Sequence, residues 1–289
     1  MDTAGVTTDP CDIMDTEFGK HSEVNLSKAE LPLTTFEIVK ERALREIAML
    51  GNSYHNRFHT EERVIPACED YAREARLSPR DSAKLTFGAL YHDFGHTGHT
   101  YRQLVAGIGA RHLSNEEFAG MQAVSAAAPW FSERECEEIR SIIHASSHNQ
   151  NHLGELPPEH AAMLYRAYKP ETNLEKILVL ADVSSFRWGT ESYLRDGINL
   201  IGESSYESIP RDFPAFLEQA MKFLTCIQAR IDGAAPLFSP SFVTKLSDEL
   251  RHVRKDLVAL SHPEGPLYSR WKSEFEHAQT SQRQKLGLV

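Results

Sequence analysis

Capping signatures followed by apolar residues at helical spacing recur along most of this chain. In TTFEIVKERALREIAML, Thr34 and Glu37 form a capping box, the pattern that marks a helix N-terminus. Apolar residues then follow at steps of three and four: Phe36, Val39, Ala43, Ile47 and Leu50. This spacing places them on one face of a helix. Convincing period-two alternation between turn residues, which would indicate strands, does not occur, so the sequence predicts an all-α fold.

The same signals predict five further helices. One is opened by Ser78 and runs through Leu90. Two others begin at Ser114 and Ser132, each with a glutamate three residues later, and the second ends near SIIHASSH. The segments NLEKILVLADVSSF and FPAFLEQAMKFLTCIQARI are the remaining two.

Changes in composition along the chain indicate its domain organisation. Residues 1–30 are polar, acidic and without periodicity, so we expect them to form a disordered tail. Residues 31–289 are expected to form a single helical domain. Within it, a break at DGAAPLFSP (232–240) separates residues 234–289 as a C-terminal helical extension. Its amphipathic stretch VTKLSDELRHVRKDLVAL is expected to pack back on the rest of the domain.

Charge and cysteine usage limit the class of partner and the compartment. The net charge of −10 argues against a nucleic-acid binder, which would normally show a basic face. A small molecule that carries phosphate stays possible, because bound metal ions reverse the local field. The four cysteines are far apart and form no CxxC pair, which favours a reducing compartment. Without an apolar run of about 18 residues or a leader, we expect a soluble cytoplasmic protein that binds no membrane.

Histidine and aspartate gather in YHDFGHTGHT, residues 91–100. His92 and Asp93 fall at the C-terminal end of the helix opened by Ser78, where glycines break it. A histidine at a helix C-terminus is mildly favourable by itself, so the pair alone has a simple structural interpretation. It is not alone, because His55 and His59 upstream are four residues apart and share one helix face.

Asp182 lies downstream inside the apolar run ILVLADV. A carboxylate in such a run is expected to be buried, and a buried charge needs a partner or a metal ion. Outward orientation, or pairing with an arginine such as Arg187, is the alternative. Together with the histidines upstream, the metal interpretation is favoured. Two neutral imidazoles and two carboxylates suit Zn²⁺, Fe²⁺ or Mn²⁺, and a shared aspartate can recruit a harder ion such as Mg²⁺.

The order His59, His92-Asp93, Asp182 on helices resembles the HD-domain superfamily of metal-dependent phosphohydrolases. Within it, YHNRFH resembles the YHNxxH signature of class I 3′,5′-cyclic nucleotide phosphodiesterases, and HDFGHTG resembles their HDxxHxG. LSNEEFA is similar to the segment that follows, and LADVSS is similar to their ADxS. The resemblance covers roughly residues 51–233. It implies a helical bundle around a metal site, like that of the phosphodiesterases.

The resemblance also implies roles for individual residues. The first metal ion, Zn, Fe or Mn, would be bound by His59, His92, Asp93 and Asp182. Asp93 would bridge to a second ion, Mg or Mn, with a hydroxide between the two ions for in-line attack on phosphorus.

Three further side chains receive roles from the same resemblance. His55 would be the general acid that protonates the leaving ribose oxygen. His96 would lie behind the ligands and hold a metal-bound water. Asn56 would be structural, as a capping side chain.

This chain departs from the family pattern after HDxxHxG. The loop reads HTY at 99–101 instead of threonine and asparagines. Further on, IIHASSHNQNH places His144, His148 and His152 at steps of four. Other HD branches use histidines of this helix for the second metal, so His144 is a candidate ligand, with a pocket or surface role as the alternative. We expect His148 and His152 to be solvated.

The phosphodiesterases read the base of the nucleotide with a glutamine and a phenylalanine on a late helix. The similar place here is FLEQAMKFL, with Gln219 and Phe223, one residue further apart than in the family. An exposed glutamine on an amphipathic helix is the alternative interpretation. These two residues are candidates for substrate binding.

Three functional hypotheses follow. The first is hydrolysis of a 3′,5′-cyclic nucleotide or a similar phosphodiester, with a small-molecule nucleotide or phosphoester as substrate. The second is another HD-domain activity, either a nucleotide monophosphate phosphohydrolase or a diiron oxygenase. The third is a non-catalytic, metal-containing ligand sensor. Retention of His55 argues against the sensor, because a structural metal ion does not need a general acid.

Overall fold

The computed structural model describes residues 33–96, 101–105, 109–113, 115–146, 170–204 and 208–288. Within these ranges the chain is helical apart from one short hairpin, so the all-α class is confirmed. A search of the same ranges for a helix long and apolar enough to span a membrane found none. The tail predicted for residues 1–30 lies outside the described residues.

The first half of the fold consists of short helices. These are α1 (Leu33–Met49), α2 (Arg57–His59), α3 (Ile65–Glu74), α4 (Pro79–Tyr91), α5 (Asn115–Ala127) and α6 (Glu133–Ala145). A π-helical turn, η2 (Thr60–Val64), joins α2 and α3 into one continuous rod. The hairpin pairs β1 (Tyr101–Val105) with β2 (Gly109–Leu113) in antiparallel register, with Tyr101 opposite Leu113.

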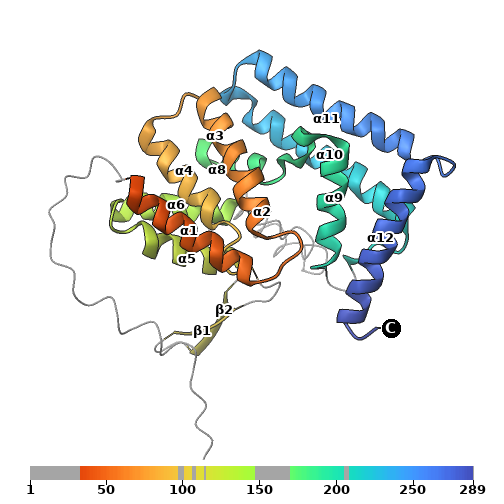
Figure 1. Ribbon diagram of the computed structural model, residues 1–289. Coiled ribbons are helices and arrows are strands. Elements are labelled where there is room, and N and C mark those ends of the chain that lie inside the picture. Colours follow the sequence, from red (N-terminus) through yellow and green to blue (C-terminus); the bar gives the residue numbers. More distant parts are fainter. Residues whose placement is uncertain are drawn as a thin grey trace, which may run out of the picture.

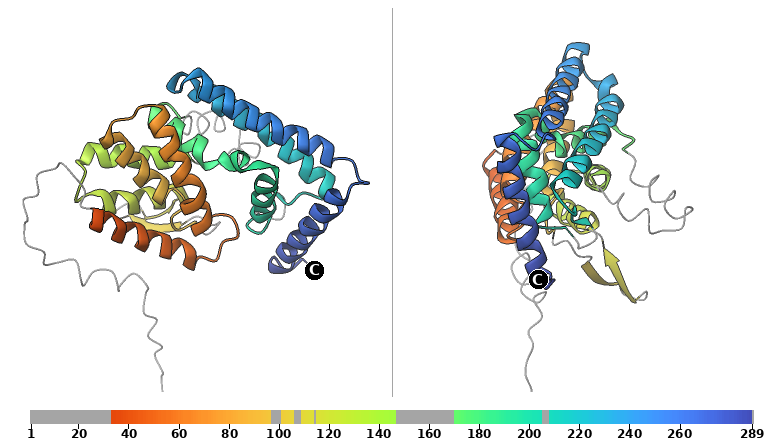
Figure 2. Two further views of the ribbon diagram at one scale, coloured as in Figure 1. Left: turned by 45° about the horizontal axis from the view of Figure 1, so that its top comes forward. Right: turned by 90° about the vertical axis from the view of Figure 1, so that its right-hand side faces the viewer.

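The second half contains the longer helices. They are α8 (Asn173–Asp182), α9 (Gly189–Ile201), α10 (Phe213–Ala234), α11 (Pro240–Leu260) and α12 (Pro266–Lys285), with short 3₁₀ turns η4 (Ser184–Trp188) and η6 (Ala235–Leu237). In Figure 1 and in the left view of Figure 2, α1 and α3–α6 form one side of the molecule and α9–α12 the other. Helix α8 contacts α3, α4 and α6 on the first side and α10 on the second.

Side-chain caps start α4, α6 and α8, and those at Ser78 and Ser132 were predicted from the sequence. Ser78 accepts from the amide of Asp81 at the start of α4. Ser132 forms a complete capping box with Glu135 at the start of α6, and Thr172 forms another at the start of α8. Each such cap typically stabilises its helix by about 0.5–2 kcal/mol.

Helices α4 and α6 pack closely where α4 carries Gly88. A Cβ built on Gly88 would lie 2.7 Å from Cγ2 of Ile142, closer than side chains approach. The glycine therefore lets α6 approach α4 one turn before His92. Phe87, which is fully buried, packs edge-on against Phe131 with ring centroids 5.4 Å apart. This contact and the glycine set the position of the C-terminal end of α4.

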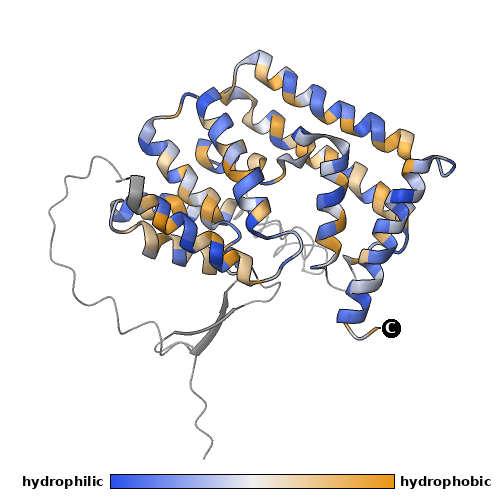
Figure 3. Ribbon diagram, viewed as in Figure 1, coloured by the Kyte–Doolittle hydropathy of each residue, from blue (hydrophilic) through white to orange (hydrophobic). Residues whose placement is uncertain are grey.

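Helix α11 packs on α9 and α10 through one amphipathic face. Its buried residues recur at steps of four and three: Leu246, Leu250, Val253, Leu257 and Leu260. Figure 3 shows hydrophobic and hydrophilic residues alternating around this helix. A buried leucine contributes about 1.5–3 kcal/mol, so this face holds α11 on α9 and α10. Residues 234–289, predicted as a C-terminal extension, contain η6, α11 and α12.

Several boundaries differ from the sequence predictions. Helix α1 begins at Leu33, so Thr34 lies in its first turn and is not its N-cap. Helix α8 ends at Asp182 and continues as 3₁₀ turn η4, whereas one continuous helix was expected. The hairpin was not predicted, because its strands lack alternating apolar residues. Helices α3, α9 and α12 were also not identified from the sequence.

Candidate metal centre

A turn at the end of α4 brings His92 and Asp93 to one place. The amide of Phe94 donates to the carbonyl of Tyr91 at 2.9 Å, and Gly95 has a φ of 72°. Glycine adopts this left-handed conformation without strain, which makes it the usual residue after a helix end. The side chains of His92 and Asp93 are consequently buried, with 2% and 6% of their surface exposed.

His59 is positioned by the cap of α2. The side-chain oxygen of Asn56 accepts from the amide of His59 at 3.1 Å, and its amide group donates to the carbonyl of Ser53 at 2.8 Å. Asn56 therefore has the structural role expected of it. The π-helical turn η2 begins directly after His59. Such turns occur often at functional sites, because they rotate the side chains on either side of them.

Asp182 is the last residue of α8 and is 7% exposed. The residues before it, Ile177 to Ala181, are buried. The prediction that this carboxylate is buried is therefore confirmed. Arg187, the alternative partner, instead lies with its guanidinium 3.0 Å from Asp70 and 3.8 Å from Glu249.

The four predicted ligands of the first metal ion form one buried cluster. Nε2 of His59 is 3.1 Å from Oδ1 of Asp182 and 3.6 Å from Oδ2 of Asp93. Nε2 of His92 is 3.0 Å from Oδ2 of Asp93 and 3.5 Å from Oδ1 of Asp182. Bonds of about 2.0–2.1 Å to a tetrahedral ion separate neighbouring ligand atoms by about 3.3–3.4 Å. His59, His92 and Asp182 each offer one donor atom within 4.8 Å of the other two, so these three could hold one divalent ion, and Asp93 lies beside both histidines.

The protonation of His92 also suits a metal ligand. Its Nδ1 lies 2.8 Å from the carbonyl of Ala89. A carbonyl only accepts, so Nδ1 carries the hydrogen and Nε2 is left to face the cluster. Nε2 of His92 and Oδ2 of Asp93 are buried and have no hydrogen-bond partner in the described part of the chain. Metal-bound histidines typically use this arrangement, with the second ring nitrogen held by a carbonyl or carboxylate.

The electrostatics of the cluster favour a cation at its centre. Burial lowers the pKa of His92, but the charges of Asp93 and Asp182 outweigh burial and hold this pKa well above its usual value. Burial raises the pKa of Asp93, and the neighbouring His92 and His55 reverse the effect and lower it. Asp93 and Asp182 thus place negative charge around His92. A divalent ion would balance that charge and displace the protons, which couples its binding to pH.

His55 lies beside this cluster and is held by Glu203. Nδ1 of His55 is 2.5 Å from Oε2 of Glu203, and the other carboxylate oxygen accepts from the backbone amides of Tyr54 and His55. Burial lowers the pKa of His55, whereas Asp93 and then Glu203 raise it, with a net increase. The His55 ring is therefore protonated more readily than an ordinary histidine.

His96 stacks on His55, with ring centroids 3.8 Å apart and an interplanar angle of 19°. Burial and the charge of His55 lower the pKa of His96, so this ring is biased toward the neutral form. His55, His96 and Glu203 could offer three donor atoms to an ion. The stacking argues against a single ion there, because imidazole lone pairs lie in the ring plane and two nearly parallel planes do not meet at one point.

His144 does not belong to either described group of possible metal ligands. It is on α6, and its Nε2 would be 3.2 Å from a Cβ built on Gly120 of α5. Burial and Arg140 lower its pKa, and it is not among the described groups that could share an ion. In this arrangement its ring faces the contact between α5 and α6. His148 and His152 lie outside the described residues.

Gln219 and Phe223 lie on α10 and are both exposed, Phe223 to 37%. No described hydrogen bond or ring contact joins either side chain to the histidines of the cluster. Their predicted role in substrate binding stays a prediction.

Sequence analysis did not identify Glu203 or Tyr54. Glu203 reaches His55 because Gly202 allows a close approach: a Cβ on Gly202 would lie 2.5 Å from Oγ of Ser53. The ring of Tyr54 packs against His55 and His59, with centroids 4.8 Å and 4.5 Å away. Tyr54 belongs to the stretch YHNRFH, so its place beside two candidate histidines could have identified it from the sequence. No sequence signal pointed to Glu203, because its contact with His55 depends on how the chain packs after α9.

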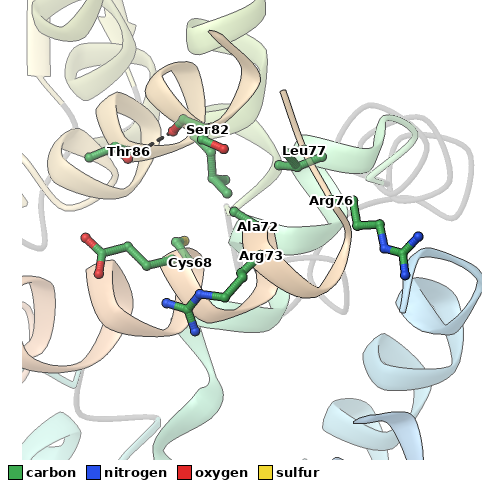
Figure 4. A pocket seen from close by; sticks show the side chains of 9 residues that line it. Cys68, Ala72, Arg73, Arg76, Leu77, Ser82 and Thr86 are labelled. Carbon is green, nitrogen blue, oxygen red and sulfur yellow. Dashed lines mark hydrogen bonds between the residues drawn. The ribbon is translucent and has the colours of Figure 1, made fainter. Parts of the chain in front are cut away.

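A cavity of about 370 Å³ opens between α3 and α4 (Figure 4). Its walls are formed by Cys68, Glu69, Ala72, Arg73, Arg76, Leu77, Ser82, Leu85 and Thr86. None of these residues belongs to the metal cluster or to the His55 pair. Burial and then the charge of Asp182 raise the pKa of Cys68, one of the lining residues.

We compared the chain with protein-family models, with curated proteins and with solved structures, and none matched.

Proposed function

We propose that this chain is a metal-dependent phosphodiesterase that hydrolyses 3′,5′-cyclic nucleotides or similar phosphodiesters. The proposal rests on one observation. The buried group of His59, His92 and Asp182 could hold a metal ion, and Asp93 lies beside both histidines. Next to this group, the carboxylate of Glu203 holds His55 in place. This combination of a metal site with a separate proton donor suits a reaction whose leaving group is a poor one.

In this proposal the first ion is Zn, Fe or Mn, bound by His59, His92, Asp93 and Asp182. A second ion, Mg or Mn, would be held by Asp93. When bound, such ions polarise phosphoryl oxygens and generate a nucleophile from water at neutral pH. The donor set of imidazoles and carboxylates is compatible with these metals.

His55 acts as the general acid. Glu203 accepts the Nδ1 hydrogen of the protonated ring, which leaves the Nε2 hydrogen to be donated to the departing oxygen. The same carboxylate is fixed by two backbone amides, so His55 is held in one orientation. His96 stacks on this ring. Its lowered pKa favours the neutral form, so the ring that stacks on His55 adds no second positive charge.

Other hypotheses make different demands on these residues. A non-catalytic sensor needs the metal ligands but not the His55–Glu203 pair. A diiron oxygenase would use the same cluster for iron and differs in its need for oxygen. A monoesterase would use the same cluster and differs in its product.

The test is a turnover screen with Mn²⁺, Mg²⁺ and Fe²⁺ added separately. We expect 3′,5′-cyclic nucleotides or acyclic nucleotide diesters to be hydrolysed without release of inorganic phosphate. Asp93→Ala should abolish this turnover. Inorganic phosphate from nucleoside monophosphates would identify a monoesterase instead, and oxygen uptake that requires iron would identify an oxygenase. Absence of any turnover with all three ions would contradict an enzymatic function.

A further inference from the structure

Two of the last carbonyls of α8 are held by side chains. The final carbonyls of a helix have no partner within it. The carbonyl of Val179 accepts from the guanidinium of Arg230 at 3.3 Å, and that of Leu180 accepts from Oγ of Ser184 at 2.6 Å. Ser184 is the first residue of η4. Its side chain therefore holds the turn that directly follows Asp182.

Ser184 is itself held by Tyr71 of α3. The two hydroxyl oxygens are 2.7 Å apart, and both residues are buried. Since Ser184 has one hydroxyl hydrogen and donates it to Leu180, Tyr71 is the donor of this bond. Burial raises the pKa of Tyr71 to about 12, so the phenol keeps its hydrogen at neutral pH. Tyr71, Ser184 and the carbonyl of Leu180 thus form one directed chain of two hydrogen bonds.

This chain of hydrogen bonds joins the two elements that carry His59 and Asp182. Helix α3 continues the rod formed by α2 and η2, and His59 is the last residue of α2. Asp182 is the last residue of α8, and its Oδ1 is 3.1 Å from Nε2 of His59. The ligands of a metal site must be held within about 0.5 Å of their working geometry. A bond between these two elements therefore bears directly on the site.

We propose that Tyr71 is a positioning residue for the metal centre. Its hydroxyl, through Ser184, sets the end of α8 and thereby the place of the Asp182 carboxylate relative to His59. Tyr71 itself binds no metal ion and acts through the backbone of α8. This inference rests on the proposed metal centre.

Other contacts hold the ring of Tyr71. Its centroid lies 5.6 Å from that of Phe238 and 5.9 Å from that of Phe242, and the guanidinium of Arg187 lies 5.1 Å away. Arg187 is in turn paired with Asp70 at 3.0 Å. A phenylalanine ring can make the same contacts, so Tyr71→Phe removes the hydroxyl and leaves the ring in place.

The test compares Tyr71→Phe with a matched control, Tyr193→Phe. Tyr193 is also buried, and its hydroxyl donates to the carbonyl of Ala220 at 2.6 Å. Each variant therefore loses one hydroxyl and one hydrogen bond at a buried ring. The bond of Tyr193 joins α9 to α10 and includes no candidate ligand.

The dissociation constant of Zn²⁺ is measured for each metal-free protein by competition with a chelating dye. We expect Tyr71→Phe to raise it roughly 2–10-fold, the change that corresponds to one lost hydrogen bond. Tyr193→Phe should leave it unchanged. Both variants should lower the melting temperature of the metal-free protein by similar amounts. The visible spectrum of bound Co²⁺, which reports the arrangement of its ligands, should change only in Tyr71→Phe.

Ser184→Ala tests the same chain of hydrogen bonds at its next link. If Tyr71 acts through Ser184, the double variant should bind Zn²⁺ no more weakly than Ser184→Ala alone. Additive losses, or an unchanged dissociation constant in Tyr71→Phe, would overturn this inference. An equal loss of affinity in Tyr193→Phe would show general structural support and would overturn it as well. A wild-type protein that binds no divalent ion at all would overturn the metal centre itself.

Discussion

His55 and Glu203 form the contact on which the proposed chemistry depends most. Removal of the acid by His55→Ala should leave metal binding intact and slow hydrolysis of a cyclic nucleotide by roughly 10²–10⁴-fold. A nitrophenyl phosphodiester should be affected far less, because its leaving oxygen needs no proton. Rates of both substrates are measured with both proteins at saturating metal. An equal fall for the two substrates would show that His55 positions substrate or supports the metal.

Glu203→Gln tests the charge that acts on His55. Burial lowers the pKa of His55, and the negative charges of Asp93 and Glu203 raise it above the usual value. A general acid works in its protonated form, so activity is present below this pKa and is lost as pH rises through it. Removal of the Glu203 charge lowers the pKa. The alkaline limb of the pH–rate profile should therefore move to lower pH in the variant, and an unmoved limb would contradict the assignment.

At the scale of helices, the contact between α4 and α6 sets where the metal ligands begin. A methyl group on Gly88 would meet Ile142 at 2.7 Å, and overpacking of this kind destabilises proteins by about 1–3 kcal/mol. Gly88→Ala should therefore lower the free energy of unfolding measured with urea. Gly233→Ala is the matched control, because nothing lies within 4 Å of its Cβ position on α10. It should be neutral or stabilising, since alanine is favoured over glycine in helices.

Local signals predicted the helices they belong to. The caps at Ser78 and Ser132 depend on residues three positions away, so the sequence shows them directly. The predicted start of α1 was late by a residue or two, because the helix begins at Leu33, before Thr34. Helix α9 was missed, although its buried residues Leu194, Ile198 and Ile201 follow helical spacing.

At the scale of the whole molecule, the candidate metal ligands come from three separate elements. His59 from α2, the His92-Asp93 turn after α4 and Asp182 from α8 meet only once these helices pack. Residue type and order predicted this set, because buried imidazoles and carboxylates have few other uses. The partner of His55 could not be predicted, since Glu203, just after α9, reaches it only when the chain has folded. The direction of His144 likewise depends on contact with Gly120.

The most direct test is elemental analysis of the purified wild-type protein beside Asp93→Ala. Asp93 is chosen because its Oδ2 lies within 3.6 Å of both ligand histidines. Both proteins are first shown to have the same helical circular dichroism. We predict a stoichiometric amount of transition metal in the wild-type chain and almost none in the variant. Equal metal in the two folded proteins would contradict a metal centre built from His59, His92, Asp93 and Asp182.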